Sequence, residues 1–114
     1  MVKMQISGCY HYVIFYVTNK EENRIDAVIY GFDNATDMRE DQCSDEQKLK
    51  MLRDLKVDPE YFFQYDCDNG EMSIHNYNHV RGNTVLKSRE HVRYFSEMLE
   101  DCYDEFVEIH ENNF

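Results

Sequence analysis

Residues 9–17, with the sequence CYHYVIFYV, constrain the fold more than any other segment of the chain. They are almost entirely apolar and rich in β-branched and aromatic side chains, which favour strands. A strand with one face in water alternates between apolar and polar residues, and this segment does not alternate. We therefore expect a central strand that is covered on both faces.

A second strand and a helix are predicted next. Residues 24–32 (RIDAVIYGF) indicate a strand that pairs with the first one as a hairpin across a polar turn. Ser44 and Gln47 have the spacing of a capping box, so we expect a helix to begin at Ser44. Pro59 requires that helix to end before it. Three leucines are expected to form its buried stripe: Leu49, Leu52 and Leu55.

The second half of the chain predicts another hairpin and a longer helix. Residues 61–68 and 71–78 flank Asn69-Gly70, a pair that favours a type I′ turn. The apolar face of this hairpin is expected to hold Phe63, Tyr65, Cys67, Met72 and Ile74. Residues 88–111 predict the final helix. Its core stripe is expected to consist of Val92, Phe95, Leu99, Cys102, Phe106 and Ile109.

These elements follow one another in the order β-β-α-β-β-α. A chain of 114 residues forms one domain, so we assign residues 1–114 to a single unit. The predicted fold class is α+β, with an antiparallel sheet and both helices on one face of it. Such a fold is a two-layer sandwich.

The charge balance limits the partners that the chain can bind. Its formal net charge is −11, from 12 basic and 23 acidic residues. Direct binding to nucleic acid or to an anionic membrane requires a basic surface, so we expect a basic protein partner instead. No apolar stretch reaches the roughly 18 residues of a membrane span. The four cysteines are widely spaced, and we expect them to be reduced in the cytoplasm, which is the host cytoplasm if a phage encodes the chain.

The last predicted helix carries the most unusual charge pattern. No Lys or Arg follows Arg93, and seven acids occur at spacings of three or four residues. They are Glu97, Glu100, Asp101, Asp104, Glu105, Glu108 and Glu111. Like charges at these spacings destabilise a helix by about 0.2–0.5 kcal/mol per pair. The helix C-terminus also favours cations, so we expect this row to bind a basic partner, although an acidic helix can also serve solubility alone.

Other residues are expected to extend this binding surface. Tyr94 and Tyr103 are candidate aromatic anchors, because tyrosine is enriched in binding hot spots. Three acids at the tip of the second hairpin would enlarge the negative surface: Asp66, Asp68 and Glu71.

The sequence predicts no catalytic, cofactor-binding or metal-binding residue, and we expect that the protein is not an enzyme. It contains no glycine-rich phosphate loop, nucleophile elbow or zincin helix. A small metal-dependent enzyme remains an alternative. On a continuous strand His75 and His79 would lie about 13 Å apart, too far to share a zinc ion. A bend at Asn78, or ligands from the pairs Cys9 with His11 and Cys67 with His75, would be needed.

In size, charge and tyrosine content the chain is similar to two groups of small acidic inhibitors. One group comprises phage counter-defence proteins, including anti-CRISPR and anti-restriction proteins, and the other comprises immunity proteins that neutralise nuclease toxins. This similarity involves no shared motif, so it implies no site residues. It implies an inhibitor of a nucleic-acid-handling enzyme, acting as a DNA mimic or as an immunity protein. An oligomerising structural or regulatory domain with no inhibitory role is a further alternative, and a homodimer is one possible oligomer.

Overall fold

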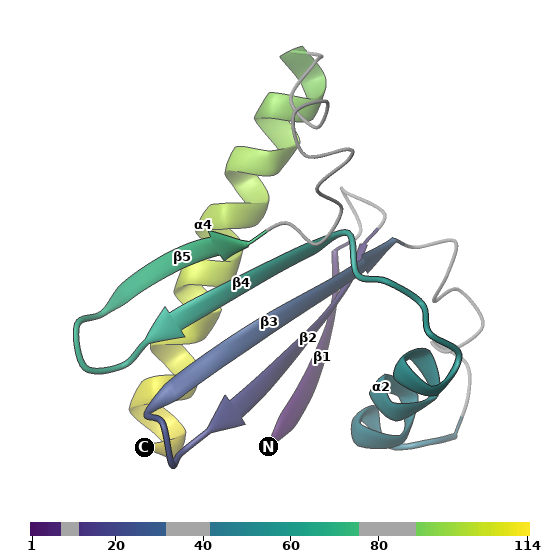
Figure 1. The fold of residues 1–114 in the computed structure, drawn as a ribbon. Helices are drawn as coiled ribbons and strands as arrows, with labels where there is room; N and C mark the ends of the chain where they lie inside the picture. The colour runs from purple at the N-terminus through teal and green to yellow at the C-terminus, as the bar shows by residue number, and fades with distance from the viewer. Residues whose placement is uncertain (8–11, 32–41, 76–88) are drawn as a thin grey trace.

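A five-stranded antiparallel sheet forms the centre of the computed structural model (Figure 1). The structure describes residues 1–7, 12–31, 42–75 and 89–114, with the backbone alone for residues 89–95. The strands lie in chain order, β1 (Val2–Ser7), β2 (Tyr12–Asn19), β3 (Arg24–Gly31), β4 (Tyr61–Asp66) and β5 (Glu71–His75). Helix α2 (Asp45–Asp54) connects β3 to β4 along the chain, and helix α4 (Arg89–Asn113) follows β5.

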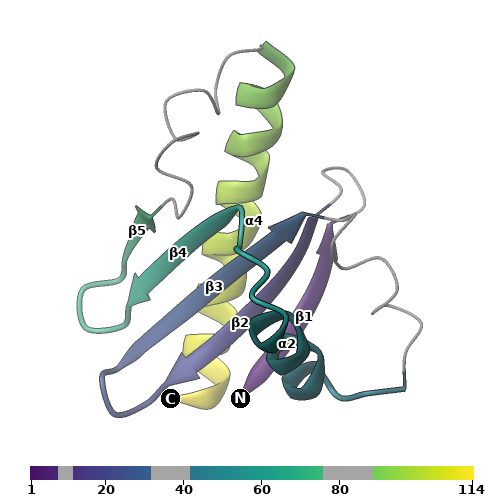
Figure 2. The same ribbon diagram turned by 45° about the vertical axis from the view of Figure 1, so that its right-hand side comes forward.

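The predicted α+β class with an antiparallel sheet is confirmed, but the predicted element order is wrong. Strand β1 precedes the predicted first strand, so the described elements follow the order β-β-β-α-β-β-α. Among the described strands, β1 lies at the edge of the sheet and pairs with β2. Figure 2 shows it at the edge of the sheet beside α2, where the backbone N–H of Met4 donates to the carboxylate of Asp45 at 3.1 Å.

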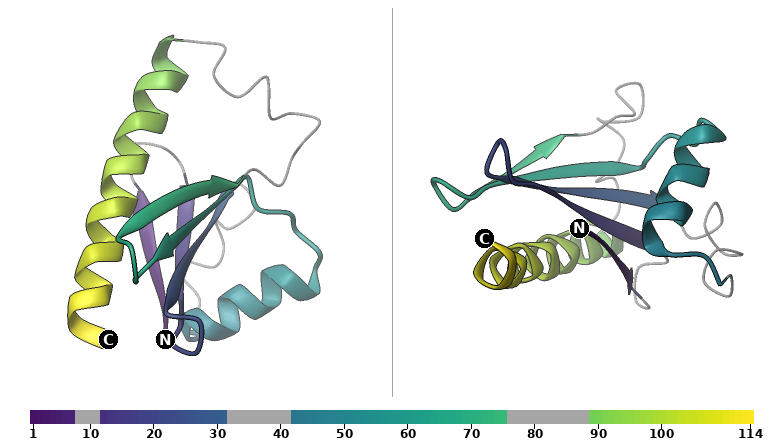
Figure 3. Two further views of the ribbon diagram at one scale, coloured as in Figure 1. Left: turned by 60° about the vertical axis from the view of Figure 1, so that its left-hand side comes forward. Right: turned by 90° about the horizontal axis from the view of Figure 1, so that it is seen from below.

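The two helices cover opposite faces of the sheet, and the prediction that both lie on one face is wrong (Figure 3). Successive strand residues point to opposite faces. In β2, Ile14 and Tyr16 therefore pack towards α4, whereas Val13 and Phe15 pack towards α2. The α4 cluster includes Ile25, Ile29, Phe63, Tyr65, Met98, Cys102, Phe106 and Ile109. The α2 cluster includes Val28, Tyr30, Leu49 and Leu52. The expected strand with both faces covered is thus confirmed for residues 12–17, which lie in β2 between β1 and β3. Residues 9–11 of the predicted segment lie outside the described residues.

The hairpin of β4 and β5 has a longer loop than predicted. Asp66 pairs with Glu71, so the connection has four residues, and the N–H of Gly70 donates to the carbonyl of Asp66 at 2.8 Å. Gly70 has a φ of 68°, but Asn69 lacks the positive φ that a type I′ turn needs, so that turn type is wrong. The predicted residues still share a face, because the longer loop shifts the register by an even number of residues. Phe63, Tyr65, Cys67 and Met72 pack in the α4 cluster, whereas Ile74 is 48% exposed.

Helix α2 begins as the sequence predicts. The Oγ of Ser44 accepts from the N–H of Gln47 at 3.2 Å, and the Oε1 of Gln47 accepts from the N–H of Ser44 at 2.9 Å. Leu49 and Leu52 are buried, as expected. Leu55 is 69% exposed because it is the C-cap residue, past the last helical turn, so its predicted place in the buried stripe is wrong.

Helix α4 spans Arg89–Asn113, and both ends lie within two residues of the predicted range of 88–111. Cys102, Phe106 and Ile109 are buried in its contact with the sheet, as predicted, and Leu99 is partly buried. Met98 is also buried there, although the sequence pattern did not single it out. The predicted core positions Val92 and Phe95 fall among the residues described by backbone alone.

Candidate acidic interface

Six of the seven C-terminal acids share one face of α4. Successive helical residues are rotated by about 100°, so these six positions fall within an arc of about 100° that points away from the sheet. This acidic face consists of Glu97, Glu100, Asp101, Asp104, Glu108 and Glu111. Glu97 is half-buried and the other five are exposed. The predicted row of carboxylates is therefore a continuous surface of one helix.

Glu105 lies at the margin of the acidic face and contacts β1. The Nζ of Lys3 donates to its Oε1, and the Glu105 side chain is 12% exposed. The hydrogen bond to Glu105 raises the pKa of Lys3, and the charges of Glu105 and Glu108 raise it further. Sequence reasoning missed this pairing because the two residues lie 102 positions apart. Glu105 thus has a partner within the chain.

Tyr103 connects α4 to the loop between β4 and β5. Its ring meets the ring of Tyr65 edge-on, with centroids 6.0 Å apart, and its hydroxyl donates to the carbonyl of Gly70 at 3.5 Å. The side chain remains 41% exposed. The side chain of Tyr94, the other predicted anchor, lies outside the described part of the chain.

The three hairpin acids differ in their surroundings. The carboxylate of Asp66 accepts from the N–H of Asp68 at 2.9 Å and from the side-chain amide of Asn69 at 2.8 Å. Asp68 in turn accepts from the side-chain amide of Asn23, which joins the two turns at this end of the sheet. Both residues therefore stabilise turns, a role that the sequence did not indicate, whereas Glu71 is exposed.

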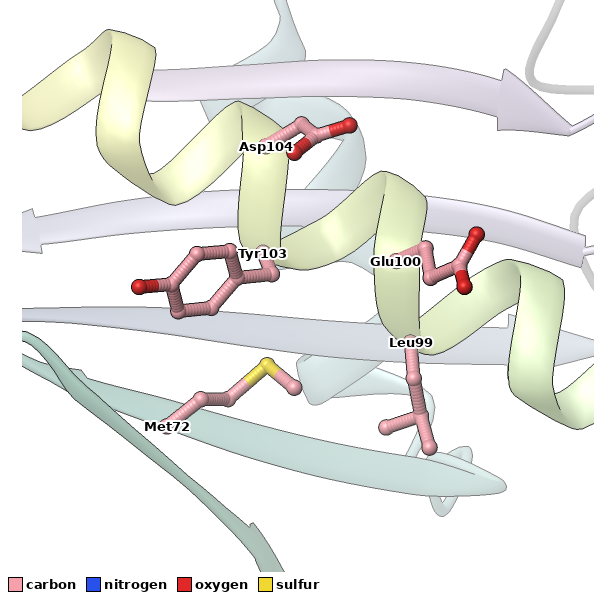
Figure 4. Close-up of a pocket in the computed structure, with 5 residues that line it drawn as sticks. All are labelled: Met72, Leu99, Glu100, Tyr103 and Asp104. Atoms are coloured by element: carbon pink, nitrogen blue, oxygen red, sulfur yellow. The ribbon is translucent and has the colours of Figure 1, made fainter.

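A cavity of about 400 Å³ lies between α4 and β5, beside the acidic face (Figure 4). We call it the α4–β5 groove. Its described lining consists of Met72, Leu99, Glu100, Tyr103 and Asp104. The sequence placed these residues on separate elements and gave no sign that they enclose a space.

Cys102 of α4 has a buried thiol that packs towards the sheet. The hydroxyl of Tyr16 donates to the Oε1 of Gln5 at 2.7 Å and lies 3.6 Å from the Sγ of Cys102. Burial raises the pKa of the Cys102 thiol to about 12. Burial also raises the pKa of the Cys67 thiol, with Asp66 and Asp68 adding to the shift. Thiols held in this state are poor nucleophiles at neutral pH.

The residues considered for a zinc site do not come together where the structure describes them. Cys67 packs in the α4 cluster, whereas His75 lies near Phe62 with ring centroids 5.8 Å apart, and Phe62 packs with the α2 cluster on the opposite face. In the described ranges, no group of three His, Cys, Asp or Glu residues could hold a metal ion. The other candidates considered, Cys9, His11 and His79, lie outside the described residues.

Comparison with known proteins gives no match among family models, curated proteins or solved structures. Of the helices that the structure describes, none is both long and apolar enough to cross a membrane.

Proposed function

We propose that this protein is an acidic inhibitor that binds the basic, nucleic-acid-binding surface of a nuclease or another nucleic-acid-handling enzyme. The acidic face of α4 is the observation that carries the proposal. Among the described residues, no ion pair involves its five exposed carboxylates, and Lys3 pairs with Glu105 at the margin. Within the described part of the chain, these five carboxylates are therefore available to a cationic partner.

Electrostatic repulsion within the acidic face supports a role in binding. Each like-charge pair three or four residues apart costs the helix about 0.2–0.5 kcal/mol. Lys and Arg side chains of a partner would relieve this repulsion and form charge-assisted hydrogen bonds to the carboxylates. Opposite charge also accelerates association between the two surfaces.

The chemistry of the face suggests how inhibition would work. On a helix, residues three or four apart have their Cβ atoms about 5–6 Å apart, so the acids of this face are close neighbours. A surface that binds phosphates presents the same donors that carboxylates accept from. A protein that occupies such a surface excludes the nucleic acid by competition. We therefore propose that the acidic face acts as a mimic of the phosphate backbone, in the manner of a phage counter-defence protein.

Inhibition by a charge-reversed variant tests the proposal. The bait is the purified protein in a host-cell lysate, and each captured nuclease is assayed for DNA cleavage with and without it. The test variant carries Asp101→Lys, Asp104→Lys and Glu108→Lys. A matched control carries Glu21→Lys, Asp54→Lys and Asp58→Lys, three exposed acids outside α4. Both variants change the net charge by the same amount.

We expect the control to inhibit as the natural protein does and the test variant to lose inhibition. Inhibition by the natural protein should weaken as salt increases, because screening reduces the attraction between exposed charges. The proposal is wrong if no captured nuclease is inhibited, or if both variants inhibit equally with the same dependence on salt.

A further inference from the structure

The α4–β5 groove combines an apolar interior with an acidic rim. Figure 4 shows the side chains of Met72, Leu99 and Tyr103 directed into the space between the helix and the strands. The carboxylates of Glu100 and Asp104 point outwards from the same stretch of helix. The groove therefore offers apolar contacts at its base and negative charge at its mouth.

One wall of the groove is held in place by the fold. The Tyr103 ring rests against Tyr65, and its hydroxyl bonds to the loop at Gly70. A side chain that is already ordered loses little conformational entropy when a ligand binds to it. Tyr103 is thus a preorganised aromatic surface in a groove that Glu100 and Asp104 also line.

We infer that the α4–β5 groove binds an arginine side chain of the basic partner. This inference rests on the proposed function and names one contact through which the acidic face would engage that partner. Arginine matches the groove in three ways. Its methylene groups pack on apolar surface, its guanidinium stacks on an aromatic ring, and the same planar group bonds to carboxylates through paired donors.

The groove is large enough to admit an arginine side chain. At about 400 Å³ it lies near the lower limit of ligand-binding pockets, which span about 300–1,000 Å³. Lysine fits less well, because its ammonium is a strongly hydrated point charge that cannot stack on Tyr103. Charge complementarity and the aromatic wall together favour arginine.

Titration with blocked amino acids tests the inference without a known partner. The protein is labelled at the methionine methyl groups, and the Met72 resonance is followed by NMR as Nα-acetylarginine amide is added. The comparison probes are the corresponding amides of lysine and citrulline, the latter having the shape of arginine without its charge. We expect a saturable shift with arginine, weaker binding of lysine, and no saturation with citrulline.

Two matched variants separate the groove from the overall charge of the protein. Glu100→Gln with Asp104→Asn should weaken arginine binding about fivefold, because two exposed charge interactions are lost. Glu46→Gln with Asp54→Asn makes the same chemical change on α2 and should leave the affinity unchanged. Tyr103→Leu should also weaken binding, whereas Tyr103→Phe should retain most of it.

The inference is overturned if the Met72 resonance does not shift saturably, if citrulline binds as well as arginine, or if the Glu100 and Asp104 substitutions have no effect. A different outcome would show that the proposed function is wrong. In that case arginine would bind in the groove, but the protein would inhibit no nuclease. Conversely, inhibition that depends on Asp101 and Glu108 but not on Glu100 would refute arginine binding in the groove and leave the proposed inhibitor function intact.

Discussion

Lys3 of β1 and Glu105 of α4 form an ion pair that joins the first described strand to the last helix. β1 is an edge strand, and in the described structure it has one neighbouring strand, β2. The Lys3 side chain is 46% exposed and that of Glu105 is 12% exposed. Glu105 is therefore the member that would be left poorly solvated without its partner.

Replacing Lys3 by Met should reduce the free energy of unfolding by up to about 1 kcal/mol at neutral pH, as for other partly exposed ion pairs. The folded state raises the pKa of Lys3 above its ordinary value of 10.5. The stabilisation should thus be complete below that value and disappear as pH rises through the raised pKa. Urea unfolding of both proteins at neutral and strongly alkaline pH measures the difference.

Lys20→Met provides the control, because Lys20 is exposed in the turn between β2 and β3. As a substitution of an exposed turn residue, it should change the free energy of unfolding by no more than about 0.5 kcal/mol. A Lys3 effect that is equally large in strongly alkaline solution would mean that packing of the Lys3 methylenes, and not the ion pair, joins β1 to α4.

The opposite placement of the helices predicts additive stability effects. Leu52→Ala should cost about 2–5 kcal/mol and Ile109→Val about 0.5–1.5 kcal/mol. Leu52 packs in the α2 cluster and Ile109 in the α4 cluster. Because the sheet separates them, the double variant should equal the sum within about 0.5 kcal/mol. Denaturant unfolding of the three variants tests this.

Tyr65 and Phe106 offer a contrasting pair within one cluster. Their rings are stacked with centroids 5.4 Å apart and an interplanar angle of 15°. Replacing each by Leu, singly and together, should reveal a coupling of about 0.5–1.5 kcal/mol. Equal coupling for this pair and for Leu52 with Ile109 would contradict the separation of the two cores.

Two features of the sequence indicated parts of the fold that the predicted architecture left out. The apolar run in β2 indicated cover on both faces, and that expectation conflicts with two helices on one face. Strand β1 was missed although Val2, Met4 and Ile6 alternate with polar residues. Strand β1 was missed because a short alternating segment is a weak signal on its own. The helices were placed on the wrong faces because a loop does not indicate which side of the sheet the following helix covers.

The candidate site was predictable only in part, for a related reason. Helical periodicity was enough to place the carboxylates on one face of α4, since that relation is local in sequence. The pairing of Glu105 with Lys3 and the meeting of Met72 with Tyr103 depend on how distant elements pack. No periodic pattern encodes such contacts, so the groove became apparent only from the structure.

The buried thiol of Cys102 predicts slow chemical modification. With a pKa of about 12, the thiolate fraction at pH 8 is about one in ten thousand. Its side chain is also fully buried, so a thiol reagent should label it only when the protein unfolds. Labelling in native buffer and in denaturant, followed by mass spectrometry of the peptides, checks this. Rapid labelling of Cys102 in native buffer would mean that α4 detaches readily from the sheet.

An acid at the C-terminus of one helix and an acid at the N-terminus of the other should have opposite effects on the free energy of unfolding when each is removed. Glu111 lies in the last turn of α4, near the negative end of the helix dipole and three residues from Glu108. Glu111→Gln should therefore raise the free energy of unfolding by about 0.3–1 kcal/mol. Glu46 lies in the first turn of α2, so Glu46→Gln should lower it by a similar amount, although both substitutions change the net charge equally. Both effects should shrink in concentrated salt. Thermal or urea unfolding measures both effects. If Glu111→Gln destabilises the protein, the Glu111 carboxylate contributes to folding. It would then not be a charge that is kept for a partner at the expense of stability.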